Sequence, residues 1–399
     1  MKKYFSIAIA AAVLAASCSK NASDSQSPGF DDENAAPEAI VFGSNVITVK
    51  SKAGGGLDSW DASQNLYVYG VRRDMSNDFT SQTQIDNVVT NAIYINNVKA
   101  LSPREGTSGS IEVYDDPAKQ IPFYYQGRTV YDFYGYYVDD AADAYKEDGV
   151  TPDPTVEPNR ISLPIIIDGG QDIMIAKPDI SEDIKADDTG EANINNSYTA
   201  FSARRKVHPK LKFEHQLARF IFKYKGGGDK YNDIKITSVT LSSKSKGTLV
   251  IADNQDENSR GIIWDADAEK RLFSLKKKID GVLVDLDYDG NVVPANEYMP
   301  LGESLLVSPS TENDKEYELT VNLEQISTGN TAKDVYIITP DKITNQETKE
   351  PQTAILKGYK YEVSIVIYGL EDIRITAELA GWENGGDIEL DPDKWNDNE

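Results

Sequence analysis

Apolar residues along most of this chain occur in short runs, and Gly, Pro, Asn and Asp bound most of these runs. Runs that alternate or contain many β-branched and aromatic residues are typical of strands. The clearest examples span residues 66–71, 131–137, 161–167, 234–241, 317–323 and 335–338. No long stretch repeats its apolar residues with a period of about 3.6, so helices should be few and short. The pattern predicts an all-β protein.

An all-β chain of this mature length is expected to form two β-sandwich domains rather than one. A polar run begins at Asn193, and a basic cluster, Arg204 to Lys206, precedes Lys210. These segments separate two strand-rich halves. We therefore expect one sandwich at residues 39–205 and a second at residues 206–399, the latter ending in an acidic tail.

Residues 1–17 have the pattern of a secretory signal peptide. Lys2 and Lys3 precede an apolar stretch that is shorter than the ~20 residues a membrane-spanning helix needs. Cys18 follows small residues in a sequence similar to a bacterial lipobox, which implies lipid attachment at Cys18 and anchoring in the outer membrane. The alternative is a plain secretory signal with an incidental thiol. Residues 18–38 contain few large apolar residues and are predicted to form a lipidated flexible tether.

The charge and the cysteine content limit the classes of partner. Cys18 is the only cysteine, so the mature chain has no internal disulfide and depends on its hydrophobic core. The formal net charge is −24. Nucleic acids and anionic lipid surfaces would be repelled by this charge, and we expect neither as a partner.

Three segments resemble motifs of a known family. They are the aromatic residues 123–125 with 131–137, the strand-like residues 211–220, and residues 358–365 with Gly381 and Trp382. Together they resemble the fimbrillin-like proteins, the pilus subunits of Gram-negative gut and oral bacteria. Val138 stands where that family often has proline. The resemblance extends from about Ile40 to Trp382 and implies two tandem transthyretin-like Greek-key sandwiches in a cell-surface lipoprotein.

The resemblance also implies assembly with other pilin subunits, including copies of this chain, by donor-strand exchange. In the mechanism that the resemblance implies, a protease removes the first strand of the N-terminal domain, and an extended segment of a neighbouring subunit fills the groove left behind. Here that strand would be residues 39–49. Family members often have Arg-Ala where this chain has Lys52 and Ala53, so Lys50 and Lys52 are the candidate processing sites. The alternative is an uncleaved, exposed glycine-rich loop, with the subunit serving as an anchor or a cap.

The donor strand cannot be identified from the sequence. Residues 373–379 alternate cleanly between apolar and polar positions, which favours a resident edge strand over a donor. The tail after Trp382 makes a weak donor because its few apolar residues stand among many acids.

The aromatic run allows two interpretations. Tyr131, Phe133 and Tyr137 share one face of the predicted strand, and Tyr134 and Tyr136 share the other. A core face with a covered second face is the simpler interpretation. A sugar-stacking platform is the other, and it would make the protein a surface glycan-binding lipoprotein that does not polymerise. A host molecule or a glycan would then be its ligand.

Metal and catalytic sites have little support in the sequence. Asp285, Asp287 and Asp289 match the first half of a calcium loop, but Asn296 stands where the bidentate glutamate is needed. Alternation over residues 282–288, followed by Asp289 and Gly290, instead favours a strand and a hairpin turn.

The two histidines, His208 and His215, would point to opposite faces of a continuous strand, and His215 is interpreted as a packed strand residue. No catalytic motif occurs. We expect neither enzymatic activity nor a cofactor.

Overall fold

The computed structural model describes residues 37–44, 65–101, 111–138, 153–183, 197–286 and 292–380, apart from gaps of one or two residues inside these ranges. Nearly all regular structure in them is β-strand. The α-helices of the described residues, α1 (Ile180–Asp183) and α2 (Ala200–Arg204), have four and five residues. The predicted all-β fold with short helices is confirmed.

The strands before residue 200 are β1 (Gly43–Ser44), β2 (Asn65–Arg72), β3 (Gln82–Ile85), β4 (Val88–Asn91), β5 (Ile93–Leu101), β6 (Tyr114–Asp116), β7 (Ile121–Pro122), β8 (Tyr131–Val138), β9 (Thr155–Val156), β10 (Arg160–Ile166) and β11 (Ile173–Ala176). Those after it are β12 (Lys210–Leu211), β13 (Phe213–His215), β14 (Ala218–Gly226), β15 (Ile234–Ser243), β16 (Lys246–Asp253), β17 (Gly261–Trp264), β18 (Arg271–Ser274), β19 (Lys276–Ile279), β20 (Val282–Asp285), β21 (Met299–Pro300), β22 (Leu305–Val307), β23 (Tyr317–Gln325), β24 (Thr331–Ile338), β25 (Ile343–Asn345), β26 (Lys360–Gly369) and β27 (Asp372–Ala380). The 3-10 helices are η1 (Arg73–Met75), η3 (Tyr231–Asp233), η4 (Glu257–Ser259) and η5 (Pro340–Lys342).

The first sandwich is built on β8. This strand lies at the centre of a five-stranded sheet with the order β13-β11-β8-β2-β5. One face of that sheet shares a buried cluster with the four-stranded sheet β17-β16-β10-β9. Ile161, Leu163 and Ile165 of β10 belong to this cluster, because alternate side chains of a strand point to the same face.

The second sandwich pairs a six-stranded sheet with a four-stranded one. The first has the order β21-β14-β26-β27-β25, with β22 also paired to β14, and the second has the order β18-β15-β23-β24. β14 and β26 run parallel, whereas β26 and β27 form an antiparallel hairpin. Phe220 of β14, Val363 of β26 and Val321 of β23 are fully buried between these sheets. They belong to the same cluster as the buried residues of β10 in the first sandwich.

Hydrogen-bonded strands connect the two sides of residue 205, where the sequence predicts a domain boundary. β10 pairs antiparallel with β16, and β11 pairs with β13. Arg160 of β10 lies opposite Asp253 of β16, and their side chains form an ion pair of 2.8 Å. The sheets therefore do not separate at this residue, and the division into domains 39–205 and 206–399 stays a prediction.

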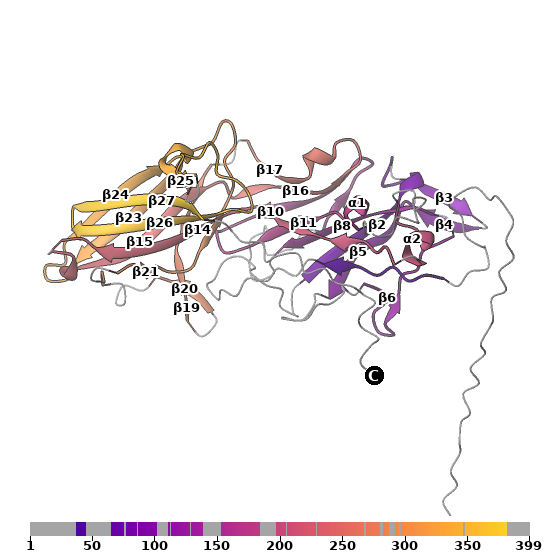
Figure 1. Cartoon of the computed structure of the whole chain (residues 1–399), viewed down its shortest axis with the longest axis horizontal. Helices are drawn as coiled ribbons and strands as arrows, with labels where there is room; N and C mark the ends of the chain where they lie inside the picture. The colour runs from indigo at the N-terminus through magenta and orange to yellow at the C-terminus, as the bar shows by residue number, and fades with distance from the viewer. Residues whose placement is uncertain are drawn as a thin grey trace, which may run out of the picture.

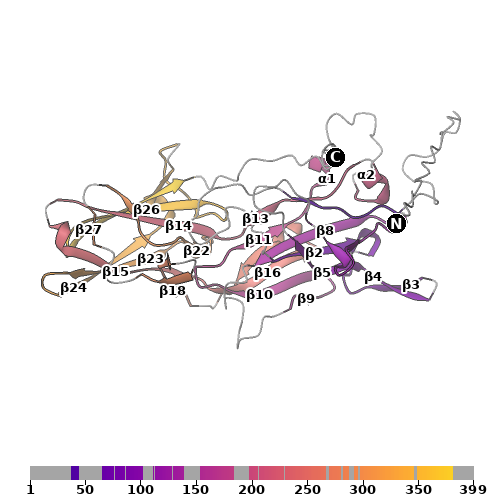
Figure 2. The same cartoon turned by 90° about the horizontal axis from the view of Figure 1, so that it is seen from below.

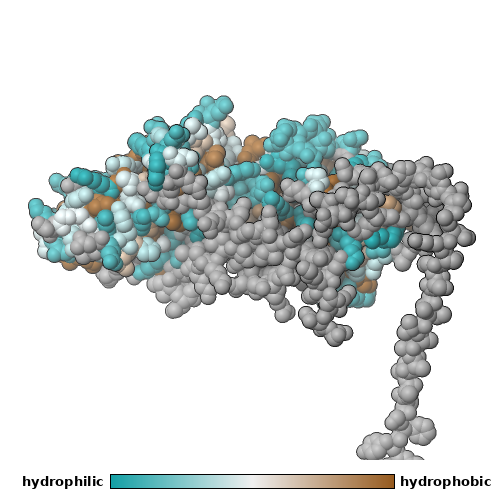
Figure 3. All heavy atoms as spheres, viewed as in Figure 1, coloured by the Kyte–Doolittle hydropathy of each residue, from teal (hydrophilic) through white to brown (hydrophobic). Residues whose placement is uncertain are grey.

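The described strands form an elongated molecule, with β3 and β4 near one end and β24 near the other (Figures 1 and 2). The face drawn in Figure 3 is largely hydrophilic where it is coloured, and apolar residues are scattered over it. Among the described residues, no helix has the length and apolar character needed to span a membrane.

Candidate functional site

The described part of the predicted removable strand lies on the outer face of the β8 sheet. The backbone N–H of Ile40 donates to the carbonyl oxygen of Phe123 at 2.7 Å, and the N–H of Tyr125 donates to the carbonyl oxygen of Glu38 at 2.9 Å. The N–H of Ile111 donates to the carbonyl oxygen of Phe42 at 3.0 Å. Backbone hydrogen bonds thus hold residues 38–42 in the same way as they hold a strand that is inserted into a sheet.

The end of this segment meets a strand from after residue 205. The N–H of Gly43 donates to the carbonyl oxygen of Pro209 at 3.0 Å, and β1 runs parallel to β12. Residues 38–44 therefore link the chain around residues 111–125 to β12. We call the space that residues 38–44 occupy the N-terminal groove.

Two side chains of the segment fill the N-terminal groove. Ile40 is 3% exposed and Phe42 is fully buried. The Phe42 ring packs edge-on against Phe133 of β8, with 5.0 Å between the ring centroids. Both side chains belong to a second buried cluster, separate from the one between the sandwich sheets.

Both faces of the aromatic run on β8 are buried. Tyr131, Phe133 and Tyr137 belong to the cluster under the N-terminal segment, and Tyr134 and Tyr136 belong to the cluster between the sheets. None of these five rings is more than 4% exposed. The interpretation of a core face with a covered second face is confirmed. The rings are not available as a sugar-stacking platform.

The floor of the N-terminal groove is almost entirely apolar. The hydroxyl oxygen of Tyr125 is buried there and has no hydrogen-bond partner among the described residues. Burial raises the pKa of Tyr125 and of Tyr131 above the ordinary tyrosine value, so both rings stay neutral. Such a groove favours an extended segment with apolar side chains, because it offers backbone partners along its sides and little polar chemistry beneath.

The residues predicted to carry lipid or to be cleaved lie outside the described residues. This holds for Cys18, Lys50 and Lys52. Lipid attachment and processing therefore stay predictions. The described segment ends at Ser44, six positions before Lys50.

The weak calcium candidates are not brought together by the described residues. Asp285 ends β20, whose antiparallel partner is β19, and it lies opposite Lys276. Asp287, Asp289 and the turn predicted after them lie outside the described residues. Within the described part of the chain, no three acidic, histidine or cysteine side chains cluster as metal ligands would. The strand predicted over residues 282–288 is confirmed for residues 282–285.

The packed role expected of His215 is confirmed. This residue ends β13 and is 5% exposed, and its Nδ1 atom lies 2.8 Å from a carboxylate oxygen of Asp172. Asp172 is fully buried and also accepts the N–H of Ile173 at 2.8 Å. The pair joins the start of β11 to β13 inside the fold.

The strand predicted at residues 373–379 is a resident strand, β27. It pairs with β26 along its whole length, while β25 covers only Ala377 to Leu379 on the other side. The part before Ala377 is therefore at an edge, as the alternation predicted, and the later part is internal.

Comparison with known proteins finds similar solved structures among fimbrial and candidate cell adhesion proteins. No family model and no curated protein matches it. Among solved structures, it is similar to a candidate cell adhesion protein from Bacteroides uniformis, with 13% identity over 87% of this chain and 99% of that chain and a TM-score of 0.48. It is also similar to the fimbrial anchor protein Mfa2 from Porphyromonas gingivalis, with 10% identity over 87% and 99% of the two chains and a TM-score of 0.35.

A third similar structure is a fimbrilin, FimA, from Porphyromonas gingivalis, with 9% identity over 86% of this chain and 98% of that chain and a TM-score of 0.37. The structural neighbours are thus fimbrial and candidate cell adhesion proteins, the class that the sequence motifs resemble.

Proposed function

We propose that this protein is a structural or adhesive subunit of a cell-surface fimbria, without catalytic activity. It would be exported as a lipoprotein, anchored in the outer membrane through Cys18, and joined to other pilin subunits by donor-strand exchange at the N-terminal groove. The main support is that residues 38–44 fill this groove with two buried side chains and backbone hydrogen bonds.

The binding energy of the segment fits a temporary occupant of the groove, which a donor strand later replaces. Burying Ile40 and Phe42 contributes roughly 3–6 kcal/mol, at ~1.5–3 kcal/mol for each side chain. While the segment is covalently attached, its effective concentration at the groove is on the order of millimolar or higher, so a strand from another molecule competes poorly. Cleavage at Lys50 or Lys52 would remove this advantage, and a donor strand with equal or greater apolar area would then replace the segment.

The residues that suggested the glycan-binding alternative are buried. Its basis in the sequence was the aromatic run, and those rings are buried on both faces of β8. These rings therefore do not support glycan binding.

The N-terminal residue of the protein on intact cells tests the role within the fimbria. Shaft subunits should begin just after Lys50 or Lys52, whereas an anchor should begin at a lipidated Cys18. A single population that begins at Cys18 in purified fimbriae would contradict exchange at the N-terminal groove.

Lipid attachment is tested separately with Cys18→Ala, since Cys18 is the only acyl acceptor in the chain. Labelling with a radioactive fatty acid should be lost, and the full-length form should no longer partition into detergent. Ser17→Ala is the matched control and should keep the label. Unchanged labelling of Cys18→Ala would refute the lipid anchor.

A further inference from the structure

A buried arginine at one end of the N-terminal groove has no anionic partner. Arg72 is the last residue of β2 and lies opposite Tyr131 of β8. Leu66 and Val68 of β2 belong to the cluster of the groove, so alternation places the Arg72 side chain on the same face. Arg72 is 7% exposed, and among the described residues no carboxylate forms an ion pair with it. A buried charge without an ionic partner is costly, which marks this position for attention to what could bind there.

Neutral groups surround the Arg72 guanidinium. Its Nη1 atom donates to the carbonyl oxygen of Asn91 at 3.0 Å, and its Nη2 atom donates to the side-chain oxygen of Gln126. The guanidinium carbon lies 5.2 Å from the centroid of the Tyr94 ring, which is a cation–π contact. A guanidinium group has five N–H donors, so the two bonds leave donors without an acceptor among the described residues. Its planar fork fits a carboxylate, which accepts two parallel hydrogen bonds.

Two tyrosine hydroxyl groups beside Arg72 also lack partners. The hydroxyl oxygens of Tyr125 and Tyr131 are buried and have no hydrogen-bond partner among the described residues. The centroids of the two rings are 5.7 Å apart. Burial raises the pKa of Tyr131, and Arg72 acts against this rise, so the guanidinium group lies near that hydroxyl. Each hydroxyl can donate one hydrogen bond, and the oxygens of a carboxylate can accept both.

Other charges near Arg72 do not neutralise it. The adjacent cation, Arg73, pairs with Asp132 at 2.6 Å. Asp115 is exposed and forms no ion pair with Arg72. Glu38 of the N-terminal segment is half-buried, and its carboxylate forms no hydrogen bond or ion pair with a described residue. The positive charge of Arg72 is therefore uncompensated at this end of the groove.

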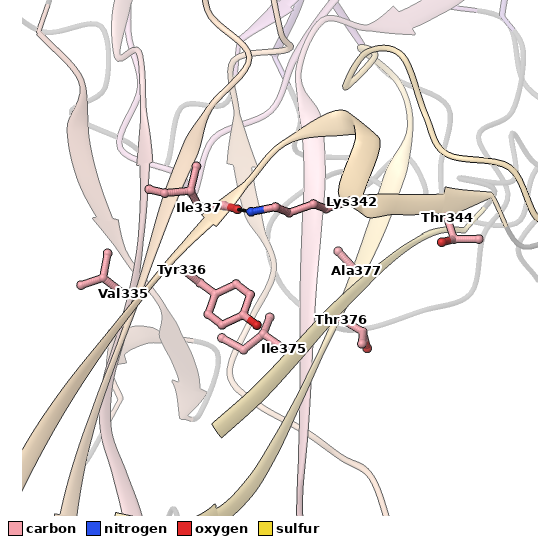
Figure 4. Close-up of a pocket in the computed structure, with 8 residues that line it drawn as sticks. All are labelled: Val335, Tyr336, Ile337, Lys342, Thr344, Ile375, Thr376 and Ala377. Carbon is pink, nitrogen blue, oxygen red and sulfur yellow. Dashed lines mark hydrogen bonds between the residues drawn. The ribbon is translucent and has the colours of Figure 1, made fainter. Parts of the chain in front are cut away.

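A lysine elsewhere in the fold shows how Arg72 differs from an ordinary surface cation. A groove of about 660 Å³ lies between β24 and β27, and Figure 4 shows Lys342 beside it. The Lys342 ammonium group donates to the carbonyl oxygen of Ile337 at 2.8 Å, and the residue is exposed. Water solvates such a group, so it needs no anion. Arg72 has little access to water and would gain more from a carboxylate.

We propose that Arg72, Tyr125 and Tyr131 form a pocket that binds the carboxylate of an acidic side chain on the incoming donor strand. This inference rests on the proposed strand exchange. The pocket adjoins the groove, because the N–H of Tyr125 donates to the carbonyl oxygen of Glu38 and removal of the segment uncovers Tyr125. Gln126 is an exposed residue, so its side chain can turn into water and leave the guanidinium fork to the carboxylate.

The N-terminal segment does not satisfy this pocket, and that favours its replacement. Ile40 and Phe42 point into the groove, so by alternation positions 38 and 36 of a strand in this register face the pocket end. The chain has alanine at position 36, and Glu38 forms no bond to Arg72. A donor strand whose acid reaches Arg72 would form charge-assisted hydrogen bonds that the segment lacks. The pocket would thus select donors with an acid at this end.

Exchange of labelled peptides tests the pocket. The mature chain carrying Cys18→Ala is cut with trypsin after the N-terminal segment, and fluorescent peptides with the sequence of residues 35–44 are added in excess. One pair of peptides carries Ala36→Glu or Ala36→Gln, and a second pair compares the unchanged peptide with Glu38→Gln. Fluorescence anisotropy gives the Kd of each. In at least one pair, the acidic peptide should bind about tenfold or more tightly than its amide counterpart.

Variants of Arg72 assign the preference to the guanidinium group. In Arg72→Met the acidic and amide peptides should bind equally well. Arg72→Lys keeps the charge without the fork and should recover part of the preference. Lys119→Met removes an exposed positive charge outside the pocket and, as the matched control, should keep the full preference. Melting temperatures show whether Arg72→Met folds, and the comparison of peptides on the parent protein does not depend on this variant.

The outcomes separate the pocket from strand exchange. Equal binding of the acidic and amide peptides to the parent protein would overturn the pocket and leave strand exchange standing. A preference for the acid that persists in Arg72→Met would also overturn it, because another group would then bind the carboxylate. If no peptide enters the groove of the cut protein, the unchanged one included, strand exchange itself fails and the pocket fails with it.

Discussion

At the scale of single residues, Phe133 joins β8, the central strand of the first sandwich, to the N-terminal segment. It is 1% exposed, and its ring packs against Phe42 and stacks on Tyr131. Phe133→Ala should lower the free energy of unfolding by about 3–5 kcal/mol, because a buried phenyl group is replaced by a cavity. Urea denaturation of the two proteins measures this. Tyr124→Ala, at a ring that is 39% exposed, should cost far less, and equal costs would contradict the packed role of Phe133.

Asp253 makes stability depend on pH. Burial opposes its ionisation, but hydrogen bonds from Arg160, from neighbouring backbone N–H groups and from Ser259 outweigh burial and hold its pKa well below 3.8. The unfolded carboxyl group titrates near 3.8. The stabilisation is therefore present above that pH and is lost as the pH falls through 3.8 toward the folded-state pKa.

Asp253→Asn should destabilise the protein at pH 7 by about 1–3 kcal/mol, since Arg160, whose side chain is 37% exposed, loses its anionic partner. It should also flatten the loss of melting temperature between about pH 5 and pH 2. Thermal melts across that range measure both effects. Asp265→Asn, at an exposed side chain, is the control. A variant as acid-sensitive as the parent would show that other carboxyl groups govern acid unfolding.

At the scale of elements, the alternation of apolar residues predicted strands well but could not predict their partners. The runs at 66–71, 234–241 and 317–323 lie within β2, β15 and β23. Alternation is local, because it reflects which side chains of one strand face the core. Pairing depends on residues far apart in the chain, so neither the parallel pairing of β14 with β26 nor the bonds across residue 205 could be predicted from it.

The same limit applies to the N-terminal groove. The sequence predicted a first strand at residues 39–49, and the described part is held as an inserted strand from residue 38 to residue 44. The partners of that segment, near Phe123 and Pro209, carry no local signal that links them to it.

Phe42 should control how long the segment stays in the groove. Among the described residues, the contacts that would still hold the segment after a cut at Lys50 or Lys52 are the backbone bonds and the side chains of Ile40 and Phe42. Phe42→Ala should therefore release it faster, on the order of a hundredfold. Mass spectrometry of the released peptide follows this rate. Val41→Ala, at a half-buried position, should change it little, and equal rates for the two variants would show that Phe42 does not hold the segment.

At the scale of the whole molecule, polymerisation would use the N-terminal groove on the five-stranded sheet of an elongated protein (Figure 1). This groove would join subunits along a fibre. Leaving it requires a whole buried strand to be stripped, so the contact between subunits should be long-lived.

Mild trypsin imitates processing and tests assembly itself. Its first cut should fall after Lys50 or Lys52, because the glycine-rich sequence that follows them is typical of a loop, and loops are attacked before a packed sandwich. The trimmed protein should then capture strands from other copies and form ladders that survive unheated detergent gels, since the apolar groove and its unpaired backbone favour a donor strand. Protein with Lys50→Gln and Lys52→Gln should stay free of ladders under the same digestion, while Lys349→Gln should behave like the parent. Trimmed protein that forms no ladder at high concentration would exclude the shaft role and leave an anchor or tip role, because the strand from residue 39 would then be a permanent part of the fold.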